Sequence, residues 1–147
     1  MGHVPEKADK TMLSQIKQGI MDCAKDNTMT AWQELEHRDN KIWAIVVGWN
    51  DGFDENIQDE YGHGGERLCM KLAYMPKHSM MSEYTMDWLY PEYPESKEHE
   101  LMDTEIGIFP DTDIEKSVNN LLEEYHNYRK ELDRIEMEAI EVEYEER

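Results

Sequence analysis

Two parts of the chain carry apolar residues every three or four positions, a spacing typical of helices that bury one face. In the first part, the apolar face consists of Leu13, Ile16, Ile20 and Cys23. Asp9 or Thr11 can cap its first turn with a side-chain oxygen. The pattern predicts a helix over Met12–Lys25. Gly19 weakens this helix by about 1 kcal/mol relative to alanine, unless it permits close packing.

The second helical pattern follows a capping box, Thr112-Asp113-Ile114-Glu115. Its apolar positions are Val118, Leu121, Leu122, Tyr125, Tyr128, Leu132 and Ile135. They predict a helix from about Asp113 to at least Met137. The acidic end, Glu138 to Arg147, has weak amphipathicity and is expected to fray.

Strand patterns fill most of the region between the two helices. The six apolar residues Ile42–Val47 predict a strand that is covered on both faces, with Ile45 and Val46 fully buried. Alternating patterns predict further strands over Leu68–Tyr74 and Tyr84–Trp88. A short fourth strand over Ile106–Ile108 ends before Pro110, as suits a sheet edge.

The segment Thr30–His37 is ambiguous. Thr30 and Gln33 have the spacing of a capping box, which predicts a short helix ending near His37. A strand over Met29–Leu35 is the alternative. The glycine-rich stretch Gly62–Gly65 is expected to be a flexible surface loop.

Together these elements predict an α+β fold. Short connections between consecutive strands favour a four-stranded antiparallel sheet, with the N-terminal helix and the long C-terminal helix packed against it. We expect a flexible lead over residues 1–10, one α+β domain over residues 11–137 and a frayed acidic end over residues 138–147.

Charge adds the main functional clue. The chain has 34 acids against 15 lysines and arginines, a net charge of -19, and Glu92–Arg147 alone holds 19 acids and 6 bases, a net of -13. Such an excess self-repels and does not help folding. It disfavours direct binding to nucleic acids and anionic membranes, and it attracts basic surfaces. The sequence therefore predicts a basic partner.

Other features indicate a cytoplasmic protein. Cys23 and Cys69 both lie in apolar-patterned segments, which predicts buried reduced thiols. Met1–Lys10 is polar, so no signal peptide is expected. The longest apolar run, Ile42–Val47, is far shorter than a membrane span.

Catalytic and metal-binding motifs are sparse. The sequence lacks a nucleophile elbow, a Cys-x-x-Cys pair and the glycine-rich phosphate loops, so we expect no enzyme, no cofactor and no metal site. One alternative is a metal-dependent hydrolase that uses His63 with Asp51 and Asp54. The loop near Asp54 fails the calcium register, because Asp59 stands where the turn needs glycine.

Two groups of acids are candidates for partner binding. The loop group is Asp51, Asp54, Glu55, Asp59 and Glu60, and the helical group is Glu131, Glu138, Glu141 and Glu145. Acids three or four residues apart on a helix form a row of negative charges about 5–6 Å from each other. A DNA duplex also presents regularly spaced negative charges, one per about 1.7 Å of axis. Such rows can imitate a phosphate backbone. Tyr90 and Tyr93, in a proline-rich loop, are candidate aromatic anchors.

The chain is small, has an acid excess and an α+β pattern, and lacks catalytic motifs. In this general character it resembles the small acidic accessory proteins of phages and mobile elements, in particular anti-CRISPR and other DNA-mimic inhibitors. The resemblance covers the whole chain but includes no diagnostic motif. It implies a non-enzymatic inhibitor that binds a basic nucleic-acid-handling protein, such as a CRISPR effector nuclease, and blocks its DNA or RNA binding. Another alternative is a dimeric adaptor that pairs through the C-terminal helix.

Overall fold

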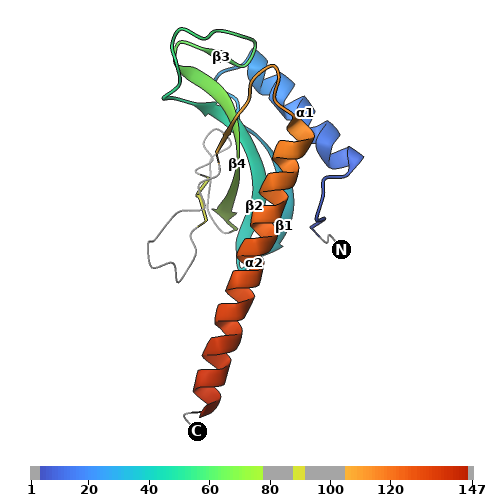
Figure 1. Cartoon of the computed structure of the whole chain (residues 1–147), viewed down its shortest axis with the longest axis vertical. Helices are drawn as coiled ribbons and strands as arrows, with labels where there is room; N and C mark the ends of the chain where they lie inside the picture. The colour runs from blue at the N-terminus through green and yellow to red at the C-terminus, as the bar shows by residue number, and fades with distance from the viewer. Residues whose placement is uncertain (1–3, 78–87, 92–104, 146–147) are drawn as a thin grey trace.

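The computed structural model describes residues 4–77, 88–91 and 105–145 and has the predicted α+β fold. Its elements are α1 (Lys10–Lys25), β1 (Ala31–Arg38), β2 (Lys41–Asn50), β3 (Gly62–His63), β4 (Glu66–Pro76), β5 (Ile106–Gly107) and α2 (Ile114–Glu145). A curled antiparallel sheet has the order β1-β2-β4-β3, and β5 pairs with β4. Both helices pack on this sheet (Figure 1). The predicted strands 42–47, 68–74 and 106–108 correspond to β2, β4 and β5.

Helix α1 forms as its apolar spacing predicts. Asp9 is the N-cap, because its side chain accepts a hydrogen bond of 2.8 Å from the Met12 backbone N–H. This bond satisfies one of the first-turn donors that have no partner within the helix. The buried face consists of Met12, Ile16, Gly19, Ile20 and Cys23. It packs mainly against β1 and β2.

Gly19 lies in the contact between α1 and β1. A Cβ at Gly19 would lie 3.0 Å from Ala31 Cβ, closer than ordinary van der Waals contact. The glycine therefore permits close packing and is more than a weak point of the helix.

We expect Gly19→Leu to lower the free energy of unfolding by about 2 kcal/mol, since it overpacks a filled interface. Gly19→Ala should be nearly neutral, because its helix propensity gain of about 1 kcal/mol offsets a small clash. Urea denaturation of both variants measures the difference, and an unchanged midpoint for Gly19→Leu would contradict this packing.

The short helix predicted over Thr30–His37 is wrong, because this segment forms β1. Residues Ala31–Arg38 pair antiparallel with β2, from Ala31 opposite Val47 to Arg38 opposite Lys41. The turn between the strands places Asp39 and Asn40 at φ 59° each, the left-handed conformation that two-residue hairpin turns require. Pairing with the buried strand β2 satisfies more backbone groups than one isolated helical turn would. The local capping-box signal was therefore overridden by the tertiary structure.

Strand β2 is the centre of the sheet. It pairs with β1 on one side and along its whole length with β4 on the other, from Lys41 opposite Pro76 to Asn50 opposite Arg67. The prediction for Ile45 and Val46 is confirmed, since they are 0% and 3% exposed. Ile45 faces the helices, within a core that also contains Trp43 and Leu72.

The opposite face of the sheet has a smaller apolar cluster, formed by Ala44, Val46, Ala73 and Trp88. Most of the strand predicted over Tyr84–Trp88 lies outside the described residues. At its end, the Leu89 backbone exchanges hydrogen bonds of 2.8 and 2.9 Å with Tyr74 of β4. This contact places Trp88 against the sheet.

The N-terminal segment packs on the first half of α2. Val4 is buried in the main core, the Ala8 N–H donates to Asn119 Oδ1 at 2.8 Å, and the His126 ring lies 2.9 Å from the Pro5 carbonyl oxygen. Residues 4–9, expected to belong to a flexible lead, thus pack on the domain. Asp113 caps α2 through the Lys116 N–H at 3.1 Å, one residue later than the Thr112 of the predicted capping box.

Helix α2 packs on the sheet only over its first half. Its buried apolar residues there are Val118, Leu121, Leu122, Tyr125 and Tyr128. Farther along, Met137 is 59% and Ile140 is 51% exposed, and the helix extends beyond the sheet to Glu145 (Figure 1). Among the helices of the described part, none is both long and apolar enough to cross a membrane.

Candidate partner-binding surface

The predicted loop acids lie together between β2 and β3. Asp51, Asp54, Glu55 and Glu60 are exposed, and Asp59 is half-buried. The loop lies at the top of the molecule in Figure 1, whereas the far end of α2 lies at the bottom. The loop and helical acids therefore occupy opposite ends of the long axis and do not form one continuous face.

Hydrogen bonds donated by backbone N–H groups to carbonyl and carboxylate oxygens hold this loop in one conformation. The Phe53 N–H donates to the Gly65 carbonyl at 3.0 Å. The Asn56 N–H donates to Asp54 Oδ1 at 2.9 Å, and the Tyr61 N–H donates to Asp59 Oδ1 at 2.9 Å. Carboxylates that accept nearby backbone N–H groups are a common way to fix turns. The loop acids are thus presented on a defined backbone.

The expectation of a flexible loop at Gly62–Gly65 is wrong. Gly62 and His63 form β3 and pair with Arg67 and Glu66 of β4. Gly64 and Gly65 have φ of 59° and 84°, which glycine adopts without steric cost in a tight hairpin turn. This hairpin closes the acidic loop and fixes its end to the sheet.

Arg67 connects the loop to the core. Its side chain is 2% exposed and donates hydrogen bonds to both Asp59 carboxylate oxygens at 3.1 and 3.0 Å. It also donates to the Ile108 carbonyl at 2.8 Å, and its guanidinium lies 3.9 Å from the centre of the Phe109 ring. The hydrogen bonds from Arg67 hold the pKa of Asp59 below its usual value. Asp59 is therefore engaged within the fold, while the other four loop acids face solvent.

Helical acids are partly neutralised by Arg134. Its guanidinium forms ion pairs with Glu131 and, at 2.6 Å, with Glu138. The hydrogen bonds from Arg134 lower the pKa of Glu131. Glu141 and Glu145 lie in the last turns of α2. The predicted row of charges is thus interrupted by a cation, which weakens its likeness to a phosphate backbone.

Of the two candidate aromatic anchors, only Tyr90 falls within the described residues, and Tyr93 lies outside them. The Tyr90 ring is partly buried, and the Lys71 ammonium lies 4.2 Å from its centre. Tyr90 therefore takes part in a cation–π contact across the sheet. This contact lies on the face of the sheet opposite the helices.

The arginines of the described residues are all paired within the chain. Arg38 pairs with Asp133 at 3.3 Å, and Arg129 pairs with Asp39 at 2.5 Å; Arg67 and Arg134 have the partners given above. By contrast, within residues 4–77, 88–91 and 105–145, no cationic side chain forms an ion pair with Asp51, Asp54, Glu55 or Glu60. These four carboxylates are the strongest candidates for an external cationic partner.

Sequence reasoning missed Ile57, which is 47% exposed among the loop acids. Its N–H donates to the Asp54 carbonyl at 3.3 Å, so the turn that presents the acids also presents this side chain. An apolar residue inside an otherwise polar loop was the available signal. It provides an apolar contact beside the carboxylates.

The residues of the alternative hydrolase site do not assemble a metal centre. Across the part of the chain that the structure describes, no three His, Cys, Asp or Glu side chains are grouped so that they could hold a metal ion. The His63 ring instead lies 5.3 Å from the Trp49 ring.

Both cysteines are free and buried, as predicted. Burial raises the pKa of the Cys23 thiol to about 11 and that of the Cys69 thiol to about 12. Both thiols are therefore protonated at neutral pH and are poor nucleophiles.

No protein-family model, curated protein or solved structure matches the chain.

Proposed function

We propose that this protein is a non-enzymatic inhibitor that binds a basic, nucleic-acid-handling protein and blocks its DNA or RNA binding. A CRISPR effector nuclease is one such target. The contact surface in this proposal is the acidic loop, defined as Asp51, Asp54, Glu55, Ile57 and Glu60. The inhibitor itself binds no nucleic acid, membrane, metal or cofactor, and it acts in the cytoplasm.

The observation that carries this proposal is the combination of order and unpaired charge in the acidic loop. Its backbone is fixed by the Phe53–Gly65 and Asn56–Asp54 hydrogen bonds and by the Asp59–Arg67 ion pair. A surface that is already ordered loses less conformational entropy on binding than a flexible one. Exposed carboxylates on such a backbone are suited to a groove that normally holds phosphates.

Charge elsewhere on the molecule supports the same partner. The net charge of -19 creates a negative field around the whole protein, and long-range attraction accelerates encounter with a basic surface. Ile57 supplies apolar contact area within the patch, whereas carboxylates alone mainly provide steering. The expected complex is therefore formed quickly and is sensitive to salt.

The proposal predicts the effect of neutralising the loop. We expect the triple variant Asp51→Asn, Asp54→Asn, Glu55→Gln to associate with the target about tenfold more slowly and with a weaker salt dependence. Amides keep the shape of each side chain, and an asparagine at position 54 can still accept the Asn56 N–H. Surface plasmon resonance at several salt concentrations, against purified CRISPR effectors and nucleases, measures both quantities.

A matched control changes the same charge at the other end of the molecule. The variant Glu136→Gln, Glu138→Gln, Glu141→Gln also removes three negative charges, but on the projecting part of α2. It should slow association much less than the loop variant. If the α2 variant slowed association more than the loop variant, the helical acids and not the loop acids would be the contact surface. If the wild-type protein binds none of the panel in a salt-sensitive way, inhibition by mimicry is refuted.

The adaptor alternative meets an obstacle in the packing of α2. A dimer through this helix would pair its apolar positions, but four of them, Leu121, Leu122, Tyr125 and Tyr128, are buried in the core of the same chain. They are unavailable to a second copy. The projecting part of α2 is strongly acidic, so two such helices would repel each other.

A further inference from the structure

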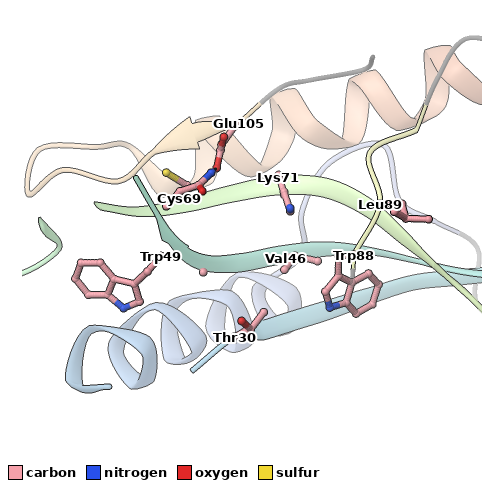
Figure 2. A pocket seen from close by; sticks show the side chains of 10 residues that line it. Thr30, Val46, Trp49, Cys69, Lys71, Trp88, Leu89 and Glu105 are labelled. Carbon is pink, nitrogen blue, oxygen red and sulfur yellow. The ribbon is translucent and has the colours of Figure 1, made fainter. Parts of the chain in front are cut away.

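A pocket of about 440 Å³ lies on the face of the sheet opposite the helices. Pockets of this size accommodate small organic ligands. Its floor is formed by neighbouring residues of two paired strands, with Val46 opposite Lys71 and Gly48 opposite Cys69. Thr30, Trp88 and Glu105 contribute to the walls (Figure 2).

Gly48 keeps the pocket hollow. A Cβ at this position would meet only Thr30, with Oγ1 at 3.6 Å, which is an ordinary contact. The central strand β2 would therefore accept a side chain here, and its backbone does not require glycine. Glycine inside a strand often marks a place where a ligand approaches the backbone. A longer side chain at position 48 would project into the pocket.

Trp88 brings a buried donor to this site. The residue is 8% exposed, and among the described residues its indole Nε1 has no hydrogen-bond partner. Buried N–H groups are nearly always paired, and a donor left without a partner costs free energy. Figure 2 shows the indole beside Val46. The nitrogen is shielded from solvent in the structure, so the indole ring must shift before an acceptor oxygen of a bound molecule can satisfy this donor.

Other polar groups define the ligand further. Thr30 offers a hydroxyl group, and the Glu105 carboxylate, which accepts a hydrogen bond from Asn50, lies beside Cys69 (Figure 2). A ligand N–H group could donate to the free lone pairs of this carboxylate. The net charge of -19 disfavours an anionic ligand, and the Lys71 ammonium that lines the pocket is already engaged with the Tyr90 ring at 4.2 Å. The indole face of Trp88 and the Val46 side chain suit a flat ring.

From this arrangement we propose that the pocket binds a neutral, planar heterocycle that carries both a carbonyl acceptor and a ring N–H donor, the chemistry of a free nucleobase or nucleoside. The carbonyl accepts from Trp88 Nε1, and the ring N–H donates to Glu105. The site is separate from the acidic loop, so it stands or falls independently of the proposed inhibition.

Titration of the full chain with uracil and with guanosine tests this proposal. The indole N–H resonance of Trp88, assigned by its loss in Trp88→Phe, should shift progressively in a ¹⁵N-correlated NMR spectrum and saturate at one ligand per chain. Trp88→Phe keeps an aromatic ring but removes the donor, so it should bind about fivefold more weakly. Gly48→Leu should abolish binding because it fills the pocket.

Controls separate the pocket from other effects. Trp32→Phe is the matched control, since the Trp32 ring lies 5.9 Å from that of Trp88 but does not line the pocket; it should bind like the wild type. Gly48→Ala, a smaller change, should bind more weakly than the wild type while melting at the same temperature. Any of three results overturns the proposal. The Trp88 resonance does not shift at millimolar uracil or guanosine, Gly48→Leu binds as well as the wild type, or indole-3-acetate binds more tightly than either neutral probe.

Discussion

Replacing Ile45 with aspartate is expected to abolish cooperative folding. Ile45 is 0% exposed and lies between Gln33 of β1 and Leu72 of β4 at the centre of the sheet. A carboxylate at this position would lose its hydration and find no cationic partner in the apolar core. A buried charge without a partner costs several kcal/mol, while a domain is stable by only about 5–15 kcal/mol.

Thermal unfolding followed by circular dichroism measures this effect. The Ile45→Asp chain should show no cooperative transition, and it should be recovered mainly as aggregate. Ile45→Val is the control, because it removes one methylene group and should cost only about 1 kcal/mol. A soluble Ile45→Asp protein that melts cooperatively near the wild-type temperature would contradict the position of β2.

The second large effect is expected at Asp59. The Asp59→Ala variant leaves the Arg67 guanidinium buried, with the Ile108 carbonyl and the Phe109 ring as its remaining partners among the described residues. We expect a loss of about 3 kcal/mol in the free energy of unfolding, since breaking one side of a buried ion pair leaves the other charge uncompensated. The loss corresponds to roughly 9 °C in melting temperature for a chain of this size. Chemical denaturation measures it.

Asp59→Ala should also loosen the acidic loop, because the Asp59 carboxylate anchors it to Arg67 and accepts the Tyr61 N–H. Faster hydrogen exchange at Tyr61 and Ile57 would report this loosening. The double variant Asp59→Ala, Arg67→Met removes both charges and should recover much of the lost stability. If Asp59→Ala were as stable as the wild type, the Asp59–Arg67 ion pair would not contribute to the stability of the fold.

The same ion pair predicts how stability responds to pH. Arg67 lowers the pKa of Asp59 in the folded protein, so the folded state favours the charged carboxylate more strongly than the unfolded state does. This contribution is fully present above the unfolded pKa of about 3.9 and is lost as the pH falls through the lower folded value. The stability difference between the wild type and Asp59→Asn should therefore shrink progressively below about pH 4. Urea midpoints of both proteins between neutral and acidic pH test this. A stability difference between the two proteins that does not change with pH would contradict the lowered pKa of Asp59.

The stability predictions at Asp59 bear on the functional proposal. Asp59→Ala keeps Asp51, Asp54 and Glu55 charged but removes the anchor of the loop. If pre-organisation contributes to partner binding, this variant should bind more weakly than its small change in net charge would imply. The neutralised triple variant separates the two causes, since it changes the charge and keeps the anchor.

The sequence by itself determined the elements whose buried face is recognisable from the spacing of apolar residues along the chain. Helix α1, most of α2 and the buried strand β2 follow from apolar periods that need no knowledge of a partner. The exposure of Asp51, Asp54, Glu55 and Glu60 also followed from the sequence, because carboxylates remain in water unless they are paired. The α+β class then resulted from the order of these elements.

Only the tertiary structure decided the features that depend on a distant partner. The segment predicted as a helix became β1 because β2 offered backbone partners along it, with one register shift between Glu34 and Glu36, and no local capping signal reveals such partners. Asp59 was separated from the other loop acids by Arg67, eight positions away in the sequence. Arg129 met Asp39 across 90 positions. Pairing depends on which side chains the fold brings within a few ångströms of each other. The sequence therefore predicted where charge is carried, and the fold decided which charges remain available to a partner.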